Sequence, residues 1–435
     1  MKHVATAVIL IVLLLLPVPA LIAEPRPGSR LVIEISDKAA DPPPANQTAK
    51  TEPSIVKAES AILVDAVTGQ ILFEKNARQR RPMASATKIM TAMLIIENCG
   101  MNDIVVAGKK ACETNNSSLH LKPGERLTVR NLLYGILIRS ANDACVAGAE
   151  RVAGTSGRFI KMMNDKAKAM GALDTHFVNP HGLYQANHYS TAYDLALIAR
   201  GAIRYPVFNE IVKTQKYVLE RSKNKNDLVL FNQSKFLKNY AGADGIKSGY
   251  TKQSGRCYVG SATRDGWRLI SVVLKSPNVS QETAALMDYG FGSFKRVAVV
   301  SKGRAAGSAV VNSGVSRTVP AVAAADLYAV APAAGRPKVT SRIELEEVSA
   351  PVRRGQKLGR MTAYVDGRPA AEVILTAAAD VEPSVLALFF PWARNGLILL
   401  IGLMVGKRYG TAVAKGAGGV GTRFAQEMRR PDRRR

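Results

Sequence analysis

Three serines in this chain are each followed three residues later by a lysine, a spacing that can make a nucleophile and its base. On a helix, residues i and i+3 lie on one face, so the amine reaches the hydroxyl. The amine accepts the proton when burial or another cation keeps it partly neutral. Ser85 opens an apolar, helix-like segment one turn before Lys88, whereas Ser54 and Ser222 lie in polar or charged stretches. We therefore expect Ser85 and Lys88 to form the functional pair, with helix N-capping as the alternative role of the serine.

Two further short patterns follow along the chain. Ser140 and Asn142 place a hydroxyl and an amide two residues apart between helical segments, where they can relay a proton and hold a substrate amide. Lys247, Ser248 and Gly249 form the only K-[ST]-G in the chain and immediately precede a β-type block. On a strand, this lysine and hydroxyl would lie beside a substrate carboxylate, and the glycine would allow close approach to the backbone.

Other common catalytic templates find little support. The chain has no G-x-S-x-G elbow and no H-E-x-x-H helix, and no two histidines stand at a metal-binding spacing. The four cysteines are scattered without a C-x-x-C pair, which indicates neither a zinc site nor a disulfide framework. We predict no metal, no cofactor and no catalytic cysteine, and the sequence leaves open whether one disulfide forms.

The elements around the three patterns predict an α+β domain. Short β-type runs at 61–64 and 70–73 flank a hairpin turn, helical segments continue to about residue 206, and a second β-type block runs from 250 to 274. Strands at both ends with helices between them predict one sheet that pairs the terminal strands. Beyond about residue 296, alternating runs such as 342–346 predict a small β-rich domain.

The two ends of the chain predict export and membrane attachment. Lys2 and His3 precede an apolar run from 4 to 22, which is typical of a secretory signal, with an uncleaved anchor as the alternative. The apolar segment 385–405 has the length of a bilayer span. Arg394 near its middle costs roughly 2.5–3.5 kcal/mol on insertion scales, so a span and an interfacial helix remain open.

A large positive net charge can indicate a protein that binds nucleic acid. The 60 Lys and Arg residues exceed the 34 Asp and Glu residues and give a formal charge of +26, which attracts anionic polymers or lipid surfaces. No zinc-finger, RNP or basic-zipper pattern accompanies the basic residues. We therefore predict no nucleic-acid partner.

In this order, S-x-x-K, S-x-N and K-[ST]-G are the signature set of penicillin-binding proteins and serine β-lactamases. From about residue 57 to 382, the chain resembles the low-molecular-weight penicillin-binding proteins, the serine-type D-Ala-D-Ala carboxypeptidases. Supporting stretches are 84–90, 139–144, 177–183 and 244–251, and 355–359 resembles a part of the β-rich module of these enzymes.

The resemblance implies that a serine attacks the D-Ala-D-Ala carbonyl of a peptidoglycan stem pentapeptide and that water hydrolyses the acyl-enzyme. Backbone N–H groups, including that of the nucleophile, would form the oxyanion hole. The implied site residues are Ser85 as nucleophile, Lys88 as general base, Ser140 and Asn142 for proton transfer and peptide orientation, and Lys247, Ser248 and Gly249 for substrate binding.

The resemblance also implies the architecture and the setting: an α+β penicillin-binding/serine β-lactamase-like transpeptidase domain, then a small β-rich domain and a C-terminal membrane anchor. Peptidoglycan stem peptides would be substrates, β-lactam antibiotics inhibitors, and the outer face of the bacterial cytoplasmic membrane the location, with roles in cell wall biogenesis and cell shape. The predicted parts are a signal peptide (1–23), a flexible tether (24–56), a catalytic domain (57–296), a β-rich domain (297–382), a membrane-anchoring segment (383–406) and a basic tail (407–435).

Two departures from the family pattern stand out. Ser248 occupies a position where the family more often has threonine, and no arginine lies near 277–280, where some relatives use one toward the substrate carboxylate.

Three other functions compete: a D,D-endopeptidase with the same site, a β-lactamase, and a non-catalytic peptidoglycan-binding scaffold. A class A β-lactamase needs a glutamate within E-x-x-L-N, and no glutamate between 145 and 244 begins that pattern.

Overall fold

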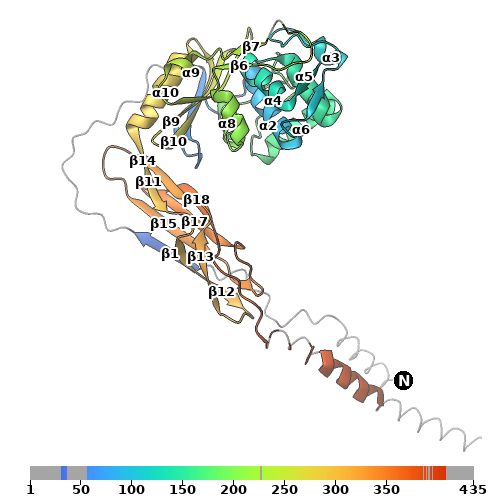
Figure 1. Ribbon diagram of the computed structural model, residues 1–435. Coiled ribbons are helices and arrows are strands. Elements are labelled where there is room, and N and C mark those ends of the chain that lie inside the picture. The colour runs from blue at the N-terminus through green and yellow to red at the C-terminus, as the bar shows by residue number, and fades with distance from the viewer. Residues whose placement is uncertain are drawn as a thin grey trace, which may run out of the picture.

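A computed structural model describes residues 31–36, 56–225, 228–385, 387, 389, 392–393 and 395–407. Figure 1 shows a unit of mixed helices and strands, an elongated β unit beside it, and a helix toward the C-terminus. The predicted signal peptide, most of the predicted tether and all but the first residue of the predicted basic tail lie outside the described residues.

The mixed unit is built on a five-stranded antiparallel sheet in the order β3-β2-β10-β9-β8. β2 pairs with β10, which confirms the predicted sheet between N-terminal and C-terminal strands. Both faces of the sheet are covered: Ile62 and Val64 of β2 face the helical lobe, whereas Ala61 and Leu63 pack toward α10. The bounds are β2 Ser60–Asp65, β3 Ile71–Lys75, β8 Ala243–Thr251, β9 Gly255–Arg264, β10 Trp267–Ser276 and α10 Val279–Ser293.

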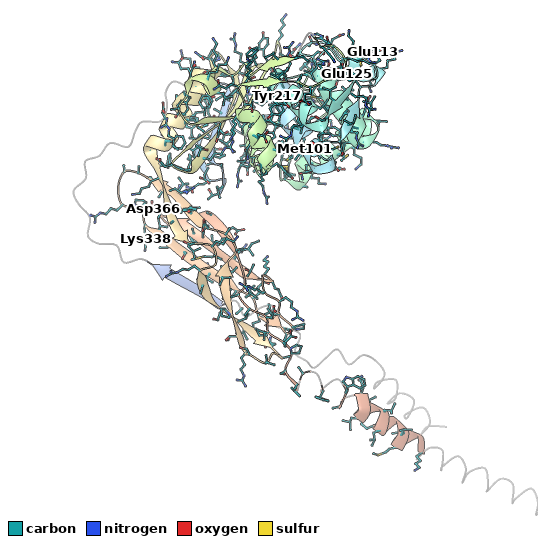
Figure 2. All side chains as sticks on the ribbon, in the orientation of Figure 1. Met101, Glu113, Glu125, Tyr217, Lys338 and Asp366 are labelled. Atoms are coloured by element: carbon teal, nitrogen blue, oxygen red, sulfur yellow. The ribbon has the colours of Figure 1, made fainter. Side chains whose placement is uncertain are left out.

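The helical lobe surrounds α2 (Lys88–Asn98), which is buried at every residue from Lys88 to Ile95 because its apolar residues cover all sides. Glu125, labelled in Figure 2 together with Tyr217 of the same lobe, forms a fully buried ion pair with Arg221. The remaining elements are η1 Ala84–Thr87, β4 Ile104–Val106, α3 Lys109–Cys112, β5 Arg126–Thr128, α4 Val129–Tyr134, η2 Gly135–Arg139, α5 Asn142–Ala153, α6 Ser156–Ala169, α7 Ala192–Ala202, α8 Pro206–Lys213, β6 Lys216–Val218, β7 Val229–Phe231 and α9 Lys235–Asn239.

The second unit is β-rich, as predicted. Its largest sheet has the order β1-β15-β17-β18-β13-β12-β16, and β11 pairs separately with β14. Two hydrogen bonds between Lys338 and Asp366, both labelled in Figure 2, join the start of β15 to the β17–β18 turn: Asp366 N–H donates to Lys338 O, and Lys338 N–H donates to the Asp366 carboxylate. The bounds are β11 Phe294–Val300, β12 Ala305–Asn312, β13 Thr318–Ala323, β14 Leu327–Pro332, β15 Val339–Leu345, β16 Val348–Ser349, β17 Lys357–Val365 and β18 Arg368–Ala377.

One strand lies inside the segment predicted as a tether. β1 (Leu31–Ser36) pairs antiparallel with β15 and forms the edge of the large sheet of the β unit (Figure 1). Its residues include a short β-type run, LVIEI, but the Pro-rich segments around it favoured an irregular chain. A single short strand gains its stability from the edge on which it pairs, which sequence composition does not report.

Residues 395–407 are helical, and most of their large apolar side chains are exposed. Within the described part of the chain, no helix is both long and apolar enough to cross a membrane.

Candidate active site

Ser85 lies in η1, a short turn that leads directly into α2, and its side chain is half-buried. The residue before it, Ala84, has φ 46°. Positive φ is strained for a residue with a Cβ, and such strain is concentrated at functional sites. Ser85 is the second residue of this helical turn, so its backbone N–H has no intrahelical acceptor.

Gly182 allows a loop to approach the nucleophile's turn closely. A Cβ built on this glycine would lie 1.9 Å from the carbonyl oxygen of Ala84, and its φ is 92°. The Asn179 side chain shapes the loop by accepting hydrogen bonds from the backbone N–H groups of His181 (3.3 Å) and Gly182 (2.7 Å). The loop therefore lies directly against η1, where the carbonyl oxygen of His181 contacts Lys88.

Lys88 is fully buried, and its ammonium is the centre of the site. Nζ lies 3.0 Å from Ser85 Oγ, 2.8 Å from Asn142 Oδ1 and 2.6 Å from the carbonyl oxygen of His181. Burial lowers the pKa of Lys88 to about 8, although Cys145 and Asp143 act in the opposite direction. The structure thus brings the predicted nucleophile and base into hydrogen-bond contact, and the base is partly neutral near physiological pH.

The Asn142 amide is held in one orientation. Its Nδ2 donates to the carbonyl oxygen of Asn115 at 3.0 Å, which leaves Oδ1 as the acceptor for Lys88. Asn142 begins α5, and its backbone N–H donates to Ser117 O at 2.7 Å. The loop around 115–117 therefore positions the amide.

The neighbouring carboxylate keeps this loop in place. Asp143 is buried and accepts hydrogen bonds from the Ser118 hydroxyl at 2.6 Å and from the backbone N–H groups of Leu119 and Leu121 at 3.0 Å. Sequence patterns gave no signal for this role, because its partners lie more than twenty residues away along the chain.

Ser140 lies at the C-terminal end of η2, two residues before the amide of the same motif. Its backbone is left-handed, with φ 63° and ψ 34°, which is uncommon for serine and places the residue in a sharp turn between helices. Its side chain is half-buried, and its hydroxyl has no hydrogen-bond partner among the described residues. Of the predicted catalytic residues, Ser85, Lys88 and Asn142 are joined by hydrogen bonds, and Ser140 is not.

The third motif lies within β8, at the edge of the five-stranded sheet. The expectation that the β-type block starts at Tyr250 was wrong: β8 begins at Ala243, and residues with low strand propensity such as Asp244 and Gly245 concealed its start. Gly249 lies against η1, since a Cβ there would be 2.9 Å from the backbone nitrogen of Ser85. A residue without a side chain is therefore needed where β8 crosses the nucleophile's turn.

Lys247 is the second buried cation of the site. Its Nζ donates to the carbonyl oxygen of Ser248 at 3.0 Å. Burial, followed by the positive charge of Lys88, lowers its pKa to about 7. The site therefore contains two buried amines, and the charge of Lys88 favours the neutral form of Lys247.

His188 supports the nucleophile's turn and was missed by the sequence analysis. Its Nδ1 accepts from the backbone N–H of Val178 at 3.1 Å, so Nε2 carries the proton and donates to Thr87 Oγ1 at 2.8 Å. Thr87 in turn donates to Ala84 O at 2.8 Å. Burial lowers the pKa of His188 to about 4, which keeps the ring neutral.

The described residues contain no group of three or more His, Cys, Asp and Glu side chains that could hold a metal ion. The four cysteines are free thiols. Burial raises the pKa of Cys145 to about 12, so this thiol beside Lys88 stays protonated. That no cysteine is catalytic stays a prediction.

A serine hydrogen-bonded to a buried lysine beside the edge of an antiparallel sheet, with an amide and a second buried lysine nearby, is the arrangement of a serine hydrolase of the penicillin-binding type. Residues 46–278 match the family model described as D-alanyl-D-alanine carboxypeptidase, and 294–383 match the one described as penicillin-binding protein 5, C-terminal domain. The chain belongs to the D-alanyl-D-alanine carboxypeptidase family and is a serine-type carboxypeptidase. Members of this family act on peptidoglycan, so the cell envelope is their place of action.

Individual relatives agree with this assignment. D-alanyl-D-alanine carboxypeptidase DacF of Bacillus subtilis (strain 168) is 32% identical over 75% of this chain and 86% of its own length. DacA of Escherichia coli (strain K12) is 34% identical over 72% of this chain and 81% of its own. The crystal structure of penicillin binding protein 5 from Haemophilus influenzae superimposes with a TM-score of 0.65 at 30% identity, covering 76% of this chain and 99% of that one.

Proposed function

We propose that this enzyme removes the terminal D-alanine of peptidoglycan stem pentapeptides through an acyl-enzyme on Ser85. The observation that carries the proposal is the buried Lys88, whose Nζ lies 3.0 Å from Ser85 Oγ and whose pKa is lowered to about 8. At pH 7 about one tenth of such an amine is neutral and able to act as a base.

In the acylation step, neutral Lys88 takes the proton of Ser85 as Oγ attacks the carbonyl carbon of the penultimate D-alanine. The C–N bond then breaks, and the terminal D-alanine leaves after its nitrogen gains a proton. The Ser140 hydroxyl is suited to pass that proton, because no other described residue binds it. Asn142 holds Lys88 through Oδ1 and thereby aims the amine at the nucleophile.

When Oγ attacks, negative charge develops on the carbonyl oxygen of the substrate, and hydrogen-bond donors must stabilise it. The Ser85 N–H points out of the start of a helical turn and is one of them. β8 offers further donors, since the outer edge of an edge strand carries unpaired N–H and C=O groups. A peptide lying along this edge would extend the sheet by one strand. Lys247, Ser248 and Gly249 are then the substrate-binding residues, with Gly249 keeping β8 close to the nucleophile.

Deacylation follows the same chemical steps, with water in place of the serine hydroxyl. Lys88 removes a proton from water, the hydroxide attacks the ester carbonyl, and Ser85 regains its proton. A β-lactam would enter the same first step, but its leaving nitrogen stays attached to the acyl group through the rest of the molecule. Inhibition by β-lactam antibiotics follows from that tethered leaving group.

The domain division at about residue 296 is supported by separate cores. One set of clustered buried side chains lies in the mixed unit, and another, from Ala309 to Val381, lies in the β unit.

We also propose that residues 1–23 direct export and that 383–406 attach the enzyme to the outer face of the cytoplasmic membrane. Exposed apolar side chains between Leu397 and Met404 support membrane attachment.

The test is intact-mass spectrometry of the protein after incubation with benzylpenicillin, alongside Ser85→Ala. We expect one penicilloyl adduct on the wild type and none on the variant, because the acyl group needs the Ser85 oxygen. D-Alanine release from a pentapeptide, compared with cleavage of a cross-linked muropeptide dimer, then separates carboxypeptidase from endopeptidase activity. A folded wild-type protein without an adduct would favour the non-catalytic scaffold and refute the proposal.

A further inference from the structure

A pocket of about 440 Å³ opens beside the third motif. It lies between the β8–β9 hairpin, the N-terminal part of α9 and the segment 277–280 at the start of α10. Ser248 of the motif forms part of its wall, so the pocket adjoins the site where the proposed function places the substrate's C-terminal end.

Two cations and no acid line this pocket. Arg256 and Lys235 are among the lining side chains, both are exposed, and none of the described lining residues is acidic. Within the described chain, neither cation has a hydrogen bond or an ion pair, although most other arginines of this unit have one. Two unpaired cations around a hydroxyl favour an anionic ligand.

The sheet register brings the arginine toward the motif serine. Ser248 pairs directly with Tyr258, and Arg256 lies two residues before Tyr258 on β9. Side chains of paired residues share a face, and so do residues two apart on one strand. Ser248 and Arg256 are therefore diagonal neighbours on one face, about 7–8 Å apart at the backbone, which a long arginine side chain spans.

Two other hydroxyls of the pocket, those of Tyr258 and Ser234, are already engaged. Tyr258 donates to the carbonyl oxygen of Gly245 at 3.0 Å, and its hydroxyl also contacts the Ser234 hydroxyl at 2.7 Å. The Ser248 hydroxyl has no such partner among the described residues, so it is available to a ligand.

We infer that Arg256, with the Ser248 hydroxyl, binds the carboxylate of the substrate's terminal D-alanine, and that Lys235 adds a second positive charge. The inference deepens the proposed function and rests on it. It also accounts for the absence of an arginine near 277–280: this chain supplies its cation from β9, where Arg256 pairs with Ser276 immediately before that segment. A guanidinium binds a carboxylate through two parallel hydrogen bonds, which selects for the free acid.

The experiment compares the full chain with Arg256→Ala on two substrates, diacetyl-L-Lys-D-Ala-D-Ala and the same peptide with a C-terminal amide. For the free acid, we expect kcat/KM to fall roughly 10- to 100-fold, as for loss of a hydrogen bond to a charged group. For the amide, which has no carboxylate, the variant should equal the wild type. Arg256→Lys should recover part of the loss, because it keeps the charge but not the paired hydrogen bonds.

Lys252→Ala is the matched control. This exposed lysine is in the turn of the same hairpin and does not line the pocket, so its removal changes the charge without removing the contact. It should leave both substrates unaffected. Equal losses on the acid and the amide, or no loss on either, would overturn the inference. A wild-type chain that forms no penicilloyl adduct overturns the proposed function itself, whereas an Arg256→Ala variant that still forms one adduct at saturating benzylpenicillin has an intact nucleophile.

Discussion

At the scale of single residues, burial is the main cause of the lowered pKa of Lys88. Lys88 has no solvent exposure and no carboxylate hydrogen-bonded to it. Burial therefore removes the water that stabilises its ammonium form, and no hydrogen-bonded counterion takes the place of that water. Its partners are a hydroxyl, an amide oxygen and a carbonyl oxygen. These neutral acceptors fix the position of the amine while they leave its proton removable.

The lowered pKa of Lys88 predicts that the acylation rate constant rises with pH. Below about pH 8 most of this amine is protonated and cannot accept the proton of Ser85. We therefore expect the acylation rate constant to rise about tenfold per pH unit at low pH and to level off above about 8. Stopped-flow acylation by a fluorescent penicillin between pH 6 and 9 measures this, with circular dichroism to verify folding. A rate constant that stays flat or falls over that range would contradict the role of Lys88 as base.

At the scale of elements, the site depends on how β8 crosses η1. The two elements come from opposite ends of the catalytic sequence, and their contact rests on Gly249, whose missing Cβ leaves room for the backbone of Ser85. The loop carrying Gly182 meets the same turn from another direction. Two glycines thus allow the backbone of three separate segments to pack around Ser85.

Gly249→Ala tests this crossing. The added methyl group would meet the backbone nitrogen of Ser85 at 2.9 Å, so the strand or the turn must move. Because misplacement by about 1 Å can cost roughly 10²-fold in rate, we expect acylation by a fluorescent penicillin to slow at least about tenfold.

The matched control for this change is Gly157→Ala in α6, where a Cβ would meet nothing within 4 Å. That variant should acylate at the wild-type rate and gain about 0.4–1 kcal/mol in the free energy of unfolding, measured by urea denaturation. If both variants acylated like the wild type, the close approach of β8 to η1 would have no catalytic importance.

At the scale of the whole molecule, the catalytic unit and the β unit are joined by specific contacts. Gln70 donates to the carbonyl oxygen of Val330 at 2.7 Å and accepts from its N–H at 3.2 Å. Val330 is fully buried in a cluster with catalytic-unit residues such as Leu72 and Trp267. These contacts therefore fix the β unit against the catalytic unit, and the C-terminal helix follows the β unit along the chain (Figure 1).

Truncation tests the proposed membrane attachment. The cut belongs after Val385, because Ser384 N donates to Ser313 O at 2.8 Å and Pro383 bridges to Gly314, which ties these residues to the β unit. We expect the shortened chain to lose binding to phosphatidylglycerol vesicles in a sedimentation assay and to keep its acylation by benzylpenicillin. The reason is that removal of 386–435 takes away the exposed apolar helix but leaves the folded units complete.

A second truncation separates apolar from electrostatic attachment. Removal of 408–435 alone takes away most of the basic tail and keeps the helical residues 395–407. This chain should still bind vesicles, including zwitterionic ones. Complete loss of binding in this variant would show that charge, rather than the apolar segment, attaches the protein.

The sequence by itself determined the chemistry and the order of the parts. The pairing of Ser85 with Lys88 follows from three-residue spacing on a helix, which is a local property of the chain. The α+β and β-rich units follow from the hydrophobic period of their segments, which is local as well. The three motifs in their order were enough to indicate the family that the comparisons then confirmed.

Only the tertiary structure decided what surrounds these residues. The acceptors of Lys88 in Asn142 and His181 lie 54 and 93 residues away along the chain, and no periodicity reports contacts of that separation. The lowered pKa, the support from His188 and the cation of Arg256 beside Ser248 all depend on such contacts. Burial and strand register arise when distant segments pack together, and a pattern confined to one segment contains neither.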